Sequence, residues 1–555
     1  MRRLCTSVLV LTALLPAGCR SAGRGATIPQ GASVPLFEGM GSHQRTVTTS
    51  SPLAQKYFDQ GLVWMFAFNH DEAIRSYQQA AELDPDCAMA WWGIALSNGP
   101  HINNPIMPAE RSVAAWEALQ RAEALKAKAT PVERALIKAL EKRYANPPPE
   151  DRKFLDEAYA AAMREVWKAY PKDPDVGTLY AEAMMDLRPW DLWMKDGKPQ
   201  PGTEETLAAI NQVLHLQPDH PGALHLHIHA TEASPNPSQA LASADRLRPL
   251  VPASGHLVHM PTHIDVLTGR WRQASESNVQ AAAADRVYRK ISPRQDFYRF
   301  YMAHNRHMLC FASMMEGRSR VALQSVREMI AEVPEDYAKT NAALLDGLMA
   351  SPCETMMRFG QWDAILREPA PASCFPIATA LWRFTRGVAY AAKGQVAEAE
   401  EERLAFEQAK AAVPKDAMFM LNPASTVLQI AKHVLDGEIA FRKGDIDSAV
   451  ASLREAVKIE DDLKYMEPPE WIQPVRHTLG AILVSNGRYE EAEKVYREDL
   501  KEWPENGWSL YGLAKCLRAR GATAEADEMD KRFRKAWARA DVTIGSSCLC
   551  VNGRG

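Results

Sequence analysis

Apolar residues return every three or four positions along most of the chain beyond residue 50, which is the spacing of one face of an α-helix. The stretch 55–85, QKYFDQGLVWMFAFNHDEAIRSYQQAAELDP, holds two such runs, separated by a polar turn and closed by Pro85. Small residues at Gly61 and Ala73 allow two antiparallel helices to pack closely there. The pattern contains no strand of any length, so it predicts an all-α protein.

The same order of small and aromatic positions returns towards the end of the chain. The stretch 476–504, RHTLGAILVSNGRYEEAEKVYREDLKEWP, repeats it with Gly480, Tyr489 and Ala492. Looser copies occupy residues 383–400, 433–460 and 509–527. These units resemble the tetratricopeptide repeat family. The resemblance implies an α-solenoid, in which stacked helical hairpins form a superhelix with a concave groove.

Changes in texture divide the chain into seven segments. Residues 20–50 are rich in Gly, Ser, Thr and Pro without an apolar period, which is the composition of a flexible tether. The repeat period is broken between 101 and 175, yet Pro131 suits the first turn of a helix, so a helical insert is predicted. The predicted segments are 1–19 signal peptide, 20–50 tether, 51–100 N-terminal repeats, 101–175 helical insert, 176–330 histidine-rich repeats, 331–545 C-terminal repeats and 546–555 tail.

The N-terminus, MRRLCTSVLVLTALLPAGCR, has the order of a secretory signal: two arginines, a short apolar run, and small residues before Cys19. The run is too short for a permanent membrane span. The stretch LLPAGC resembles a bacterial lipobox, which implies lipidation of Cys19, with simple cleavage and secretion as the alternative. We therefore expect an exported protein, either lipid-anchored on the periplasmic face of the outer membrane or free in the periplasm or medium. The lipid is its only expected contact with a membrane.

The charge balance excludes one class of partner. Lys and Arg number 65 and Asp and Glu number 69, which gives a formal charge of -4 over 555 residues. Such a chain has no excess of cations with which to neutralise a phosphate backbone. We therefore expect no nucleic acid among its partners.

Cysteines of an exported protein meet oxidising conditions, in which they pair. The chain has nine, of which Cys5 would leave with the signal and Cys19 would carry the lipid. Seven remain, and an odd number cannot all pair. Cys353 with Cys374 and Cys548 with Cys550 are the candidate disulfides.

Histidines in the central segment keep the period of the repeats. The stretch 220–234, HPGALHLHIHATEAS, is predicted to be a helix by alignment with the repeats on either side. His225 and His259 are 34 positions apart, and so are His229 and His263, which matches the length of one repeat. These pairs are therefore expected at equivalent places on the first helices of adjacent units.

Further residues fall on the same helical stripe. At about 100° per residue, repeat positions 2, 5, 9 and 12 share one face of the first helix. In the tetratricopeptide repeat family this face lines the concave groove, and the resemblance implies the same here. The residues predicted to converge are His225, His229, Glu232, His256, His259, His263, His304 and His307.

Neutral imidazoles with a carboxylate are preferred ligands of transition metals. The cluster therefore predicts a site for zinc, copper or iron, without identifying the ion. Two other interpretations stay open, because protonated imidazoles repel one another unless something bridges them. One is recognition of an anion or polar ligand, and the other is a structural hydrogen-bond network. The motif HExxH of zinc proteases is absent, since HLHIH lacks the glutamate.

Polar residues near the stripe have several predicted places. His227 falls on the packing face, where a hydrogen-bonded core histidine is expected. Glu182 and Asp186 are predicted to turn to the same groove from an earlier helix. A loop that either breaks the helices or approaches the groove rim holds His101, Asn103 and Asn104.

The sequence thus favours an extracytoplasmic repeat scaffold whose histidine-lined groove binds a transition metal or small ligand, with a protein or peptide as partner. One alternative is a metalloenzyme that uses the same cluster, with Glu232 as ligand or base. Another is a purely structural solenoid for protein–protein contacts. No phosphate-binding loop, GxGxxG or GxSxG motif points to a different activity.

Overall fold

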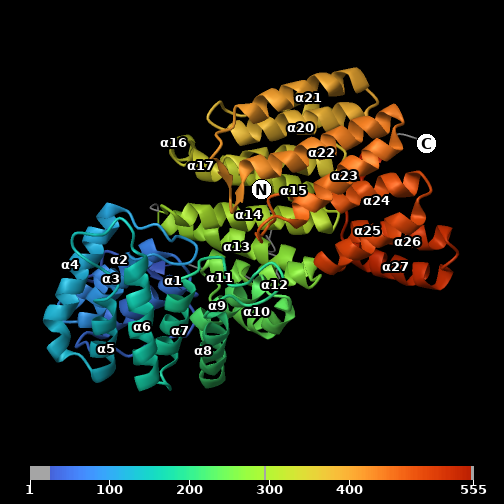
Figure 1. Cartoon of the computed structure of the whole chain (residues 1–555). Coiled ribbons are helices and arrows are strands. Elements are labelled where there is room, and N and C mark those ends of the chain that lie inside the picture. Colours follow the sequence, from blue (N-terminus) through green and yellow to red (C-terminus); the bar gives the residue numbers. More distant parts are fainter. Residues whose placement is uncertain (1–25, 293–294, 552–555) are drawn as a thin grey trace, which may run out of the picture.

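The computed structural model describes residues 26–292 and 295–551, and most of them lie in helices that stack side by side (Figure 1). This confirms the prediction of an all-α solenoid. The signal segment and Cys19 lie outside the described residues. Within the described ranges, no helix combines the length and the apolar character that crossing a lipid bilayer requires.

The N-terminal half begins with two short strands that pair antiparallel, followed by helices that run up to the histidine-rich segment. The elements are β1 (Ala26–Thr27), β2 (Leu36–Phe37), α1 (Pro52–Phe66), α2 (His70–Leu83), α3 (Ala88–Ser97), α4 (Ala109–Leu125), η1 (Lys126–Lys128), α5 (Pro131–Leu140), α6 (Lys153–Ala169), α7 (Pro174–Met185) and α8 (Thr203–Leu216).

The middle of the chain joins the two halves of the molecule (Figure 1). Its elements are α9 (Pro221–Glu232), η2 (Pro237–Ala240), α10 (Leu241–Leu247), α11 (Gly255–His259), α12 (Pro261–Leu267), α13 (Trp271–Ile291), α14 (Tyr298–Met315) and α15 (Ser319–Ala331).

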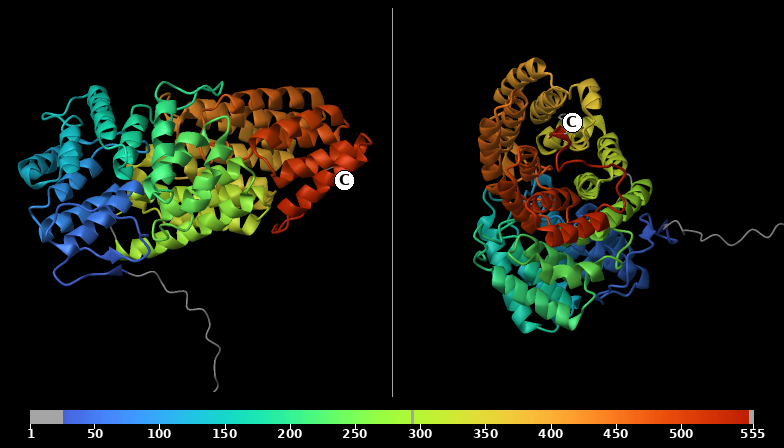
Figure 2. Two further views of the ribbon diagram at one scale, coloured as in Figure 1. Left: turned by 90° about the horizontal axis from the view of Figure 1, so that it is seen from below. Right: turned by 90° about the vertical axis from the view of Figure 1, so that its right-hand side faces the viewer.

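The C-terminal half closes into a ring of helices, which Figure 2 (right) shows along its axis. Its elements are α16 (Glu335–Thr340), α17 (Ala342–Leu345), η3 (Gly347–Ala350), α18 (Ser351–Arg358), α19 (Trp362–Arg367), α20 (Pro376–Ala392), α21 (Val396–Ala411), β3 (Met418–Phe419), β4 (Asn422–Pro423), α22 (Ala424–Lys443), α23 (Ile446–Asp461), α24 (Val475–Ser485), α25 (Tyr489–Glu502), α26 (Gly507–Ala519), α27 (Thr523–Ala536) and η4 (Leu549–Val551).

Close packing inside each hairpin rests on small residues facing aromatic rings. A Cβ atom placed on Gly61 or Gly93 would lie within 2.8 Å of the Tyr77 ring, so α1 and α3 approach α2 only because these positions are glycine. In the C-terminal half, Gly480 faces the Tyr496 ring in the same way. A hairpin of this size cannot bury its own apolar face, and stacking therefore merges the hairpins into two continuous cores, one in each half.

The segment 101–175, predicted to be a helical insert, carries helices α4, α5 and α6. Helix α5 begins at Pro131, and Thr130 and Glu133 form a reciprocal capping box at its N-terminus. Helices α4 and α6 complete the insert, which packs against α3 and α7 as a continuation of the same solenoid.

The prediction of a flexible tether over residues 20–50 is wrong for its described part, residues 26–50. The segment lacks an apolar period, but polar side chains of the helices hold its backbone. The Gln60 side chain accepts the N–H of Phe37 in β2 and donates to the carbonyl of Pro35 just before it. Glu133 accepts the N–H and hydroxyl of Thr48. Arg45 is buried between Asp173 and Asp175, at 2.8 and 3.0 Å. Composition alone cannot reveal anchoring of this kind.

The last described residues, up to Val551, turn into the ring of C-terminal helices (Figure 2, right). The hydroxyl of Ser547 lies 2.6 Å from that of Tyr496, and η4 packs on α20 and α24. Cys548 and Cys550 form a disulfide, one of the two pairings considered. Cys353 and Cys374 are free, because Cys353 is buried in the core while Cys374 lies in the loop before α20.

Candidate metal centre

Helix α9 turns three side chains with ligand atoms to one face. His225, His229 and Glu232 follow one another at helical spacing and therefore share a stripe. The His220 side chain caps the helix by accepting a backbone N–H, and Pro221 occupies the first turn. All three side chains of the stripe are buried, with exposures between 0% and 6%. The predicted helix over this stretch is confirmed.

Helices α11 and α12 supply the next three histidines. The backbone stays helical through Met260, but Pro261 has no N–H to donate and so interrupts the hydrogen-bond ladder. His256, His259 and His263 nevertheless lie on one side of this broken helix. The ring centroid of His256 lies 4.9 Å from that of His225 on α9, and the ring centroid of His263 lies 5.7 Å from that of His229. The 34-residue offset thus places histidines of successive units against one another.

His225, His229 and His256 form a group that we call the first triad. Each offers one ring nitrogen within 4.8 Å of those of the other two. The Nε2 atoms of His225 and His256 are 3.2 Å apart. Two imidazole ligands of one tetrahedral ion lie about 3.3 Å apart when each nitrogen is about 2.05 Å from the metal. The pair His225 and His256 therefore has the spacing of two ligands of one ion, and a nitrogen of His229 lies within 4.8 Å of both.

Hydrogen bonds fix which nitrogen of the first triad carries a proton. Nδ1 of His225 lies 2.7 Å from the Phe66 carbonyl, and Nδ1 of His229 lies 2.9 Å from a Glu232 oxygen. Both oxygens only accept, so both Nδ1 atoms must donate. In the neutral rings, Nε2 then carries a lone pair. Nε2 of His229 is buried, and no atom of the described residues donates to it.

The second triad consists of His259, His263 and His304, the last from α14. One ligand atom of each lies within 4.8 Å of those of the others, and the ring centroids of His259 and His304 are 4.6 Å apart. The Nε2 atoms of His259 and His263 are only 2.8 Å apart. Ligands at right angles on one ion would lie about 2.9 Å apart.

The second triad has fixed tautomers as well. Asn278 donates its Nδ2 to a backbone carbonyl, so its Oδ1 is the atom that faces Nδ1 of His259 at 2.8 Å. Nδ1 of His263 faces a Glu232 oxygen at 2.5 Å. Both rings therefore donate through Nδ1 and present Nε2 to each other. Two lone pairs at this distance repel, unless a proton or a cation lies between them.

Glu232 links the two triads. One of its oxygens accepts from His229 of the first triad and the other from His263 of the second. A second carboxylate, Glu467, comes from the loop between α23 and α24, and its Oε2 lies 2.8 Å from Nδ1 of His263. Carboxylates that accept from the outer nitrogen of a histidine orient the ring and raise its basicity towards a metal.

Burial and charge set the protonation of the centre. Burial, reinforced by neighbouring imidazoles, lowers the pKa well below the ordinary value in His225, His256, His259 and His304. Against burial, the carboxylates of Glu467 and Glu232 raise the pKa of His263 to about 10. At Glu232, the nearby imidazoles of His229 and His263 outweigh burial and lower the pKa to about 2. At Glu467, burial raises the pKa to about 8. Most of the rings are therefore neutral at neutral pH.

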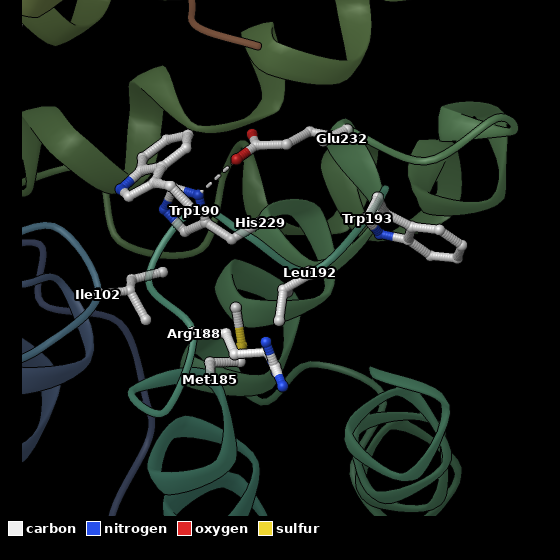
Figure 3. A pocket seen from close by; sticks show the side chains of 9 residues that line it. Ile102, Met185, Arg188, Trp190, Leu192, Trp193, His229 and Glu232 are labelled. Carbon is white, nitrogen blue, oxygen red and sulfur yellow. Dashed lines mark hydrogen bonds and ion pairs between the residues drawn. The ribbon is translucent and has the colours of Figure 1, made fainter. Parts of the chain in front are cut away.

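A small cavity of about 20 Å³ adjoins the first triad, and Figure 3 shows its walls. The Trp190 ring lies against the ring of His229, with centroids 5.5 Å apart, and Ile102 and Leu192 close the sides. Glu232 reaches His229 from the opposite side. A polar cavity needs roughly 10–15 Å³ to admit one water molecule. The space beside His229 therefore fits a single water-sized ligand.

The structure brings together seven of the eight predicted residues. The exception is His307, which is buried on α14, where burial lowers its pKa to about 4. Within the described ranges, no hydrogen bond or ring contact joins His307 to either triad. His227 is buried, with Nδ1 2.7 Å from the Ser243 hydroxyl, which confirms it as a hydrogen-bonded core histidine.

The other polar candidates lie around the centre rather than in it. Glu182 is buried on α7, and Asp186, the residue that follows this helix, pairs with Arg143 at 2.6 Å. Burial raises the pKa of Glu182 to about 8. His101 approaches the first triad through one intervening ring: its centroid is 4.6 Å from that of Phe68, which lies 4.4 Å from that of His225.

Sequence reasoning missed four participants: Phe68, Trp190, Asn278 and Glu467. Phe68 follows α1 in FAFNHDEA and has a left-handed backbone, with φ of 55°. Asn278 sits on a second helix and Glu467 lies far away in the chain, so neither shares the period of the histidines. For Glu467, the irregular loop YMEPPEW was the one signal in the sequence.

Comparisons with known proteins agree with this architecture. Tetratricopeptide repeat profiles match residues 59–98, 437–463 and 477–531, which lie in the hairpins of both halves. The chain is a tetratricopeptide repeat protein. All six histidines of the two triads lie outside the segments that these profiles match. No curated protein sequence is similar enough to count as a relative.

Solved structures similar to this tetratricopeptide repeat protein include human IFIT1 in a dimer with m7Gppp-AAAA, with 15% identity and a TM-score of 0.31 over 88% of this chain and 91% of that one. The Cut9-Hcn1 hetero-tetramer of APC/C has 13% sequence identity and a TM-score of 0.29, over 88% of this chain and 74% of that one. Yeast Tom70 has 11% identity and a TM-score of 0.27, over 87% of this chain and 90% of that one. At such scores nothing about ligands or partners follows from the likeness.

The shifted pKa of Glu232 predicts how the metal-free protein responds to acid. Its folded pKa of about 2 is below the ordinary 4.5, so the stability it adds is complete above pH 4.5 and is lost as the pH falls through 2. In chemical denaturation, we expect Glu232→Gln to lower the free energy of unfolding most between pH 5 and 6.5, by up to about 3 kcal/mol. The difference should shrink steadily below pH 4.5.

His263 limits the same effect on the alkaline side. Its raised pKa adds stability that is complete below 6.5 and is lost as the pH rises through about 10. The exposed Glu165→Gln variant should follow the wild-type curve at every pH and serves as the control. A constant difference between Glu232→Gln and wild type from pH 2 to 9 would contradict the assigned pairing.

Proposed function

We propose that this tetratricopeptide repeat protein is an extracytoplasmic metal-binding scaffold that holds one transition-metal ion at each triad. The observation that carries the proposal is the convergence of three imidazoles in each triad, with one ring nitrogen of each within 4.8 Å of the others and with Nε2 of His229 lacking a partner among the described residues. Imidazole sites suit zinc, copper and iron, which are the candidate ions.

A bound proton is the competing explanation for each pair, and the two triads differ in this respect. In the second triad, His263 can hold a proton between its Nε2 and that of His259, because two carboxylates support its charge. In the first triad, a neutral His256 can donate its Nε2 hydrogen to Nε2 of His225, because no partner in the described residues holds its Nδ1, so this pair needs no extra proton. The tautomers fixed there leave the His229 lone pair unused by the described residues. A cation coordinated by all three nitrogens satisfies them together.

A structural network without metal is the weaker interpretation. Buried polar atoms in folded proteins almost always have partners, and an unsatisfied buried nitrogen costs about 1–3 kcal/mol. Here both Nε2 of His229 and Nδ1 of His256 lack a hydrogen-bond partner among the residues that the structure describes. A network selected only for stability would not leave two such atoms in one triad.

Elemental analysis of protein purified without a histidine tag tests the proposal. We expect about two ions per chain after reconstitution with zinc, copper or iron(II), given one ion for each three-histidine set. His225→Ala/His229→Ala should hold one ion, retained at the second triad, and His259→Ala/His263→Ala should also hold one. Combining all four substitutions should abolish binding.

Two control variants separate a specific loss from a general effect of losing histidine. His307→Ala removes a buried histidine next to the second triad, and His215→Ala removes an exposed one. Both should keep the wild-type metal content. Wild-type protein that is isolated without metal and takes up none of the three ions would end the proposal.

The extracytoplasmic place rests on the signal-like N-terminus and the lipobox-like stretch ending at Cys19. We expect the protein to sediment with membranes, and Cys19→Ser to shift it to the soluble or precursor fraction because it removes the acylated atom. Cys374→Ser, which alters a free cysteine elsewhere, should remain with the membranes. Soluble wild-type protein that carries no lipid by mass spectrometry would point to simple cleavage.

A metalloenzyme is the second candidate, favoured by the cavity beside His229 and Glu232 that fits one water-sized ligand. Such a position is what catalysis at a metal ion requires and a structural site lacks. Azide added to the cobalt(II)-loaded protein should then shift its visible absorption. The shift should vanish in His225→Ala/His229→Ala, and an unchanged wild-type spectrum would indicate a closed, non-catalytic site.

We propose a protein or peptide partner only because the chain contains tetratricopeptide repeats, and we do not place it at the histidine triads. The concave face that carries the histidines is filled by side chains, and the ring of C-terminal helices contains the chain's own end. A peptide therefore has no place at the triads themselves, and their proposed ligand is the ion.

A further inference from the structure

A second kind of ligand cluster lies in the C-terminal half, where the last described turn of the chain meets α22. Cys548 precedes η4, Cys550 lies in it, and Glu438 comes from α22. One ligand atom of each lies within 4.8 Å of those of the other two. All three residues are buried, with exposures between 1% and 5%. We call them the tail cluster.

Hydrogen bonds hold the backbone on both sides of the two cysteines. Just before them, the Ser547 hydroxyl donates to the carbonyl of His477 at 2.8 Å. At the second cysteine, Arg442 of α22 donates to the carbonyl of Cys550. These bonds do not involve the sulfur atoms. The sulfurs are therefore kept next to Glu438 by the backbone, whether or not they are bonded to each other.

Glu438 brings a carboxylate that its surroundings do not satisfy. The residue is 1% exposed, and its Oε2 has no hydrogen-bond partner among the described residues. Carboxylates that are buried in folded proteins are paired, hydrogen-bonded or bound to a metal. Ligand atoms close directly around a metal ion at about 2.0–2.3 Å, so such a site needs no water-sized cavity beforehand. An ion seated among the three ligand atoms would satisfy this carboxylate.

The backbone also favours a charged sulfur in this place. The N–H of Cys550 donates to Sγ of Cys548 at 3.3 Å. A hydrogen bond to the charged form of a group stabilises that form, and the thiolate is the form of cysteine that binds metals. Arg442 adds a positive charge one helical turn beyond Glu438. The cluster is thus prepared for thiolates rather than thiols.

A purely structural disulfide is the competing explanation. A disulfide stabilises a protein mainly by restricting the unfolded chain, and the effect grows with the length of the closed loop. Cys548 and Cys550 are two positions apart, so their bond closes a very short loop. The hydrogen bonds of Ser547 and Arg442 already fix this segment. A structural role also leaves the unsatisfied carboxylate of Glu438 unexplained.

The chemistry of the ligands selects the ion. Thiolates select zinc and copper(I) over harder ions, and zinc accepts carboxylate oxygen as well as sulfur. Around a tetrahedral zinc ion, two sulfurs lie about 3.8 Å apart, and a sulfur and an oxygen about 3.6 Å apart. Both separations are within the 4.8 Å that the three ligand atoms already span. Zinc is therefore the ion that suits the set.

We propose that reduction of the Cys548–Cys550 disulfide creates a zinc site, formed by the two thiolates and the Glu438 carboxylate. A dithiol supplies the two electrons and two protons: the S–S bond breaks, two thiols form, and the dithiol becomes a disulfide. Zinc then replaces both thiol protons, which pass to the solvent. The site shares no residue with the histidine triads, so it is independent of the metal function proposed for them.

The test is titration of the full mature chain with cobalt(II), before and after reduction by a dithiol that is then removed under argon. Cobalt(II) stands in for zinc and absorbs in the near ultraviolet when a thiolate binds it, whereas imidazole and carboxylate ligands give no such band. We expect the reduced protein to bind about one more ion per chain than the oxidised protein, with a band that saturates at that ion. Excess zinc should abolish the band.

Variants assign the band to the tail cluster. Cys548→Ser/Cys550→Ser should lose both the band and the additional ion, because it removes both sulfurs. Glu438→Gln keeps the volume of the side chain and removes its charge, so it should weaken cobalt binding by at least about tenfold. Two matched controls should bind as the wild type does: Cys374→Ser, at a free cysteine, and Glu354→Gln, at another buried glutamate of the C-terminal half.

The wild-type spectrum decides the matter even if a variant fails to fold. Reduced wild-type protein without the near-ultraviolet band would overturn the zinc site, as would a folded Glu438→Gln variant that binds cobalt as tightly as the wild type. Removing four triad histidines, His225, His229, His259 and His263, should leave the band intact. Metal at the triads without the band would end this inference alone, whereas the band without metal at the triads would end only the proposed function.

Discussion

The centre of this molecule depends on a single carboxylate. Glu232 accepts an N–H from a histidine of each triad, and in doing so it fixes Nδ1 as the donor in both rings and turns their Nε2 atoms towards the interior. The Phe66 carbonyl and the Asn278 amide do the same for two further rings. Because the Nδ1 atoms of these rings donate outwards, their Nε2 atoms point inwards and face one another.

Periodicity accounts for what could be predicted from the sequence. Stacked hairpins of constant length place residues 34 positions apart at equivalent positions of neighbouring units. The spacing alone thus predicts that His225 and His259, and His229 and His263, lie on adjacent first helices, and the rings of the second pair are in contact. Glu467 could not be found in this way, because a loop far along the chain obeys no repeat. The anchoring of residues 26–50 was also invisible, since it uses isolated polar contacts instead of an apolar face.

Burial changes the meaning of the concave face. In an open solenoid this face is a surface for recognition, whereas here it is filled by rings, by the Glu467 loop and by the end of the chain. Imidazoles in such surroundings stay neutral and lose contact with water, which favours soft cations over protons. The repeat architecture thus provides a closed interior in place of a groove, with access limited to small molecules.

The contact between Glu467 and His263 joins parts of the chain that belong to different cores. Glu467 lies in the loop between α23 and α24 of the C-terminal half, while His263 lies on α12 in the middle of the chain. The charge state of this imidazole therefore affects one contact between the two cores, to which the Lys195–Asp462 ion pair also contributes.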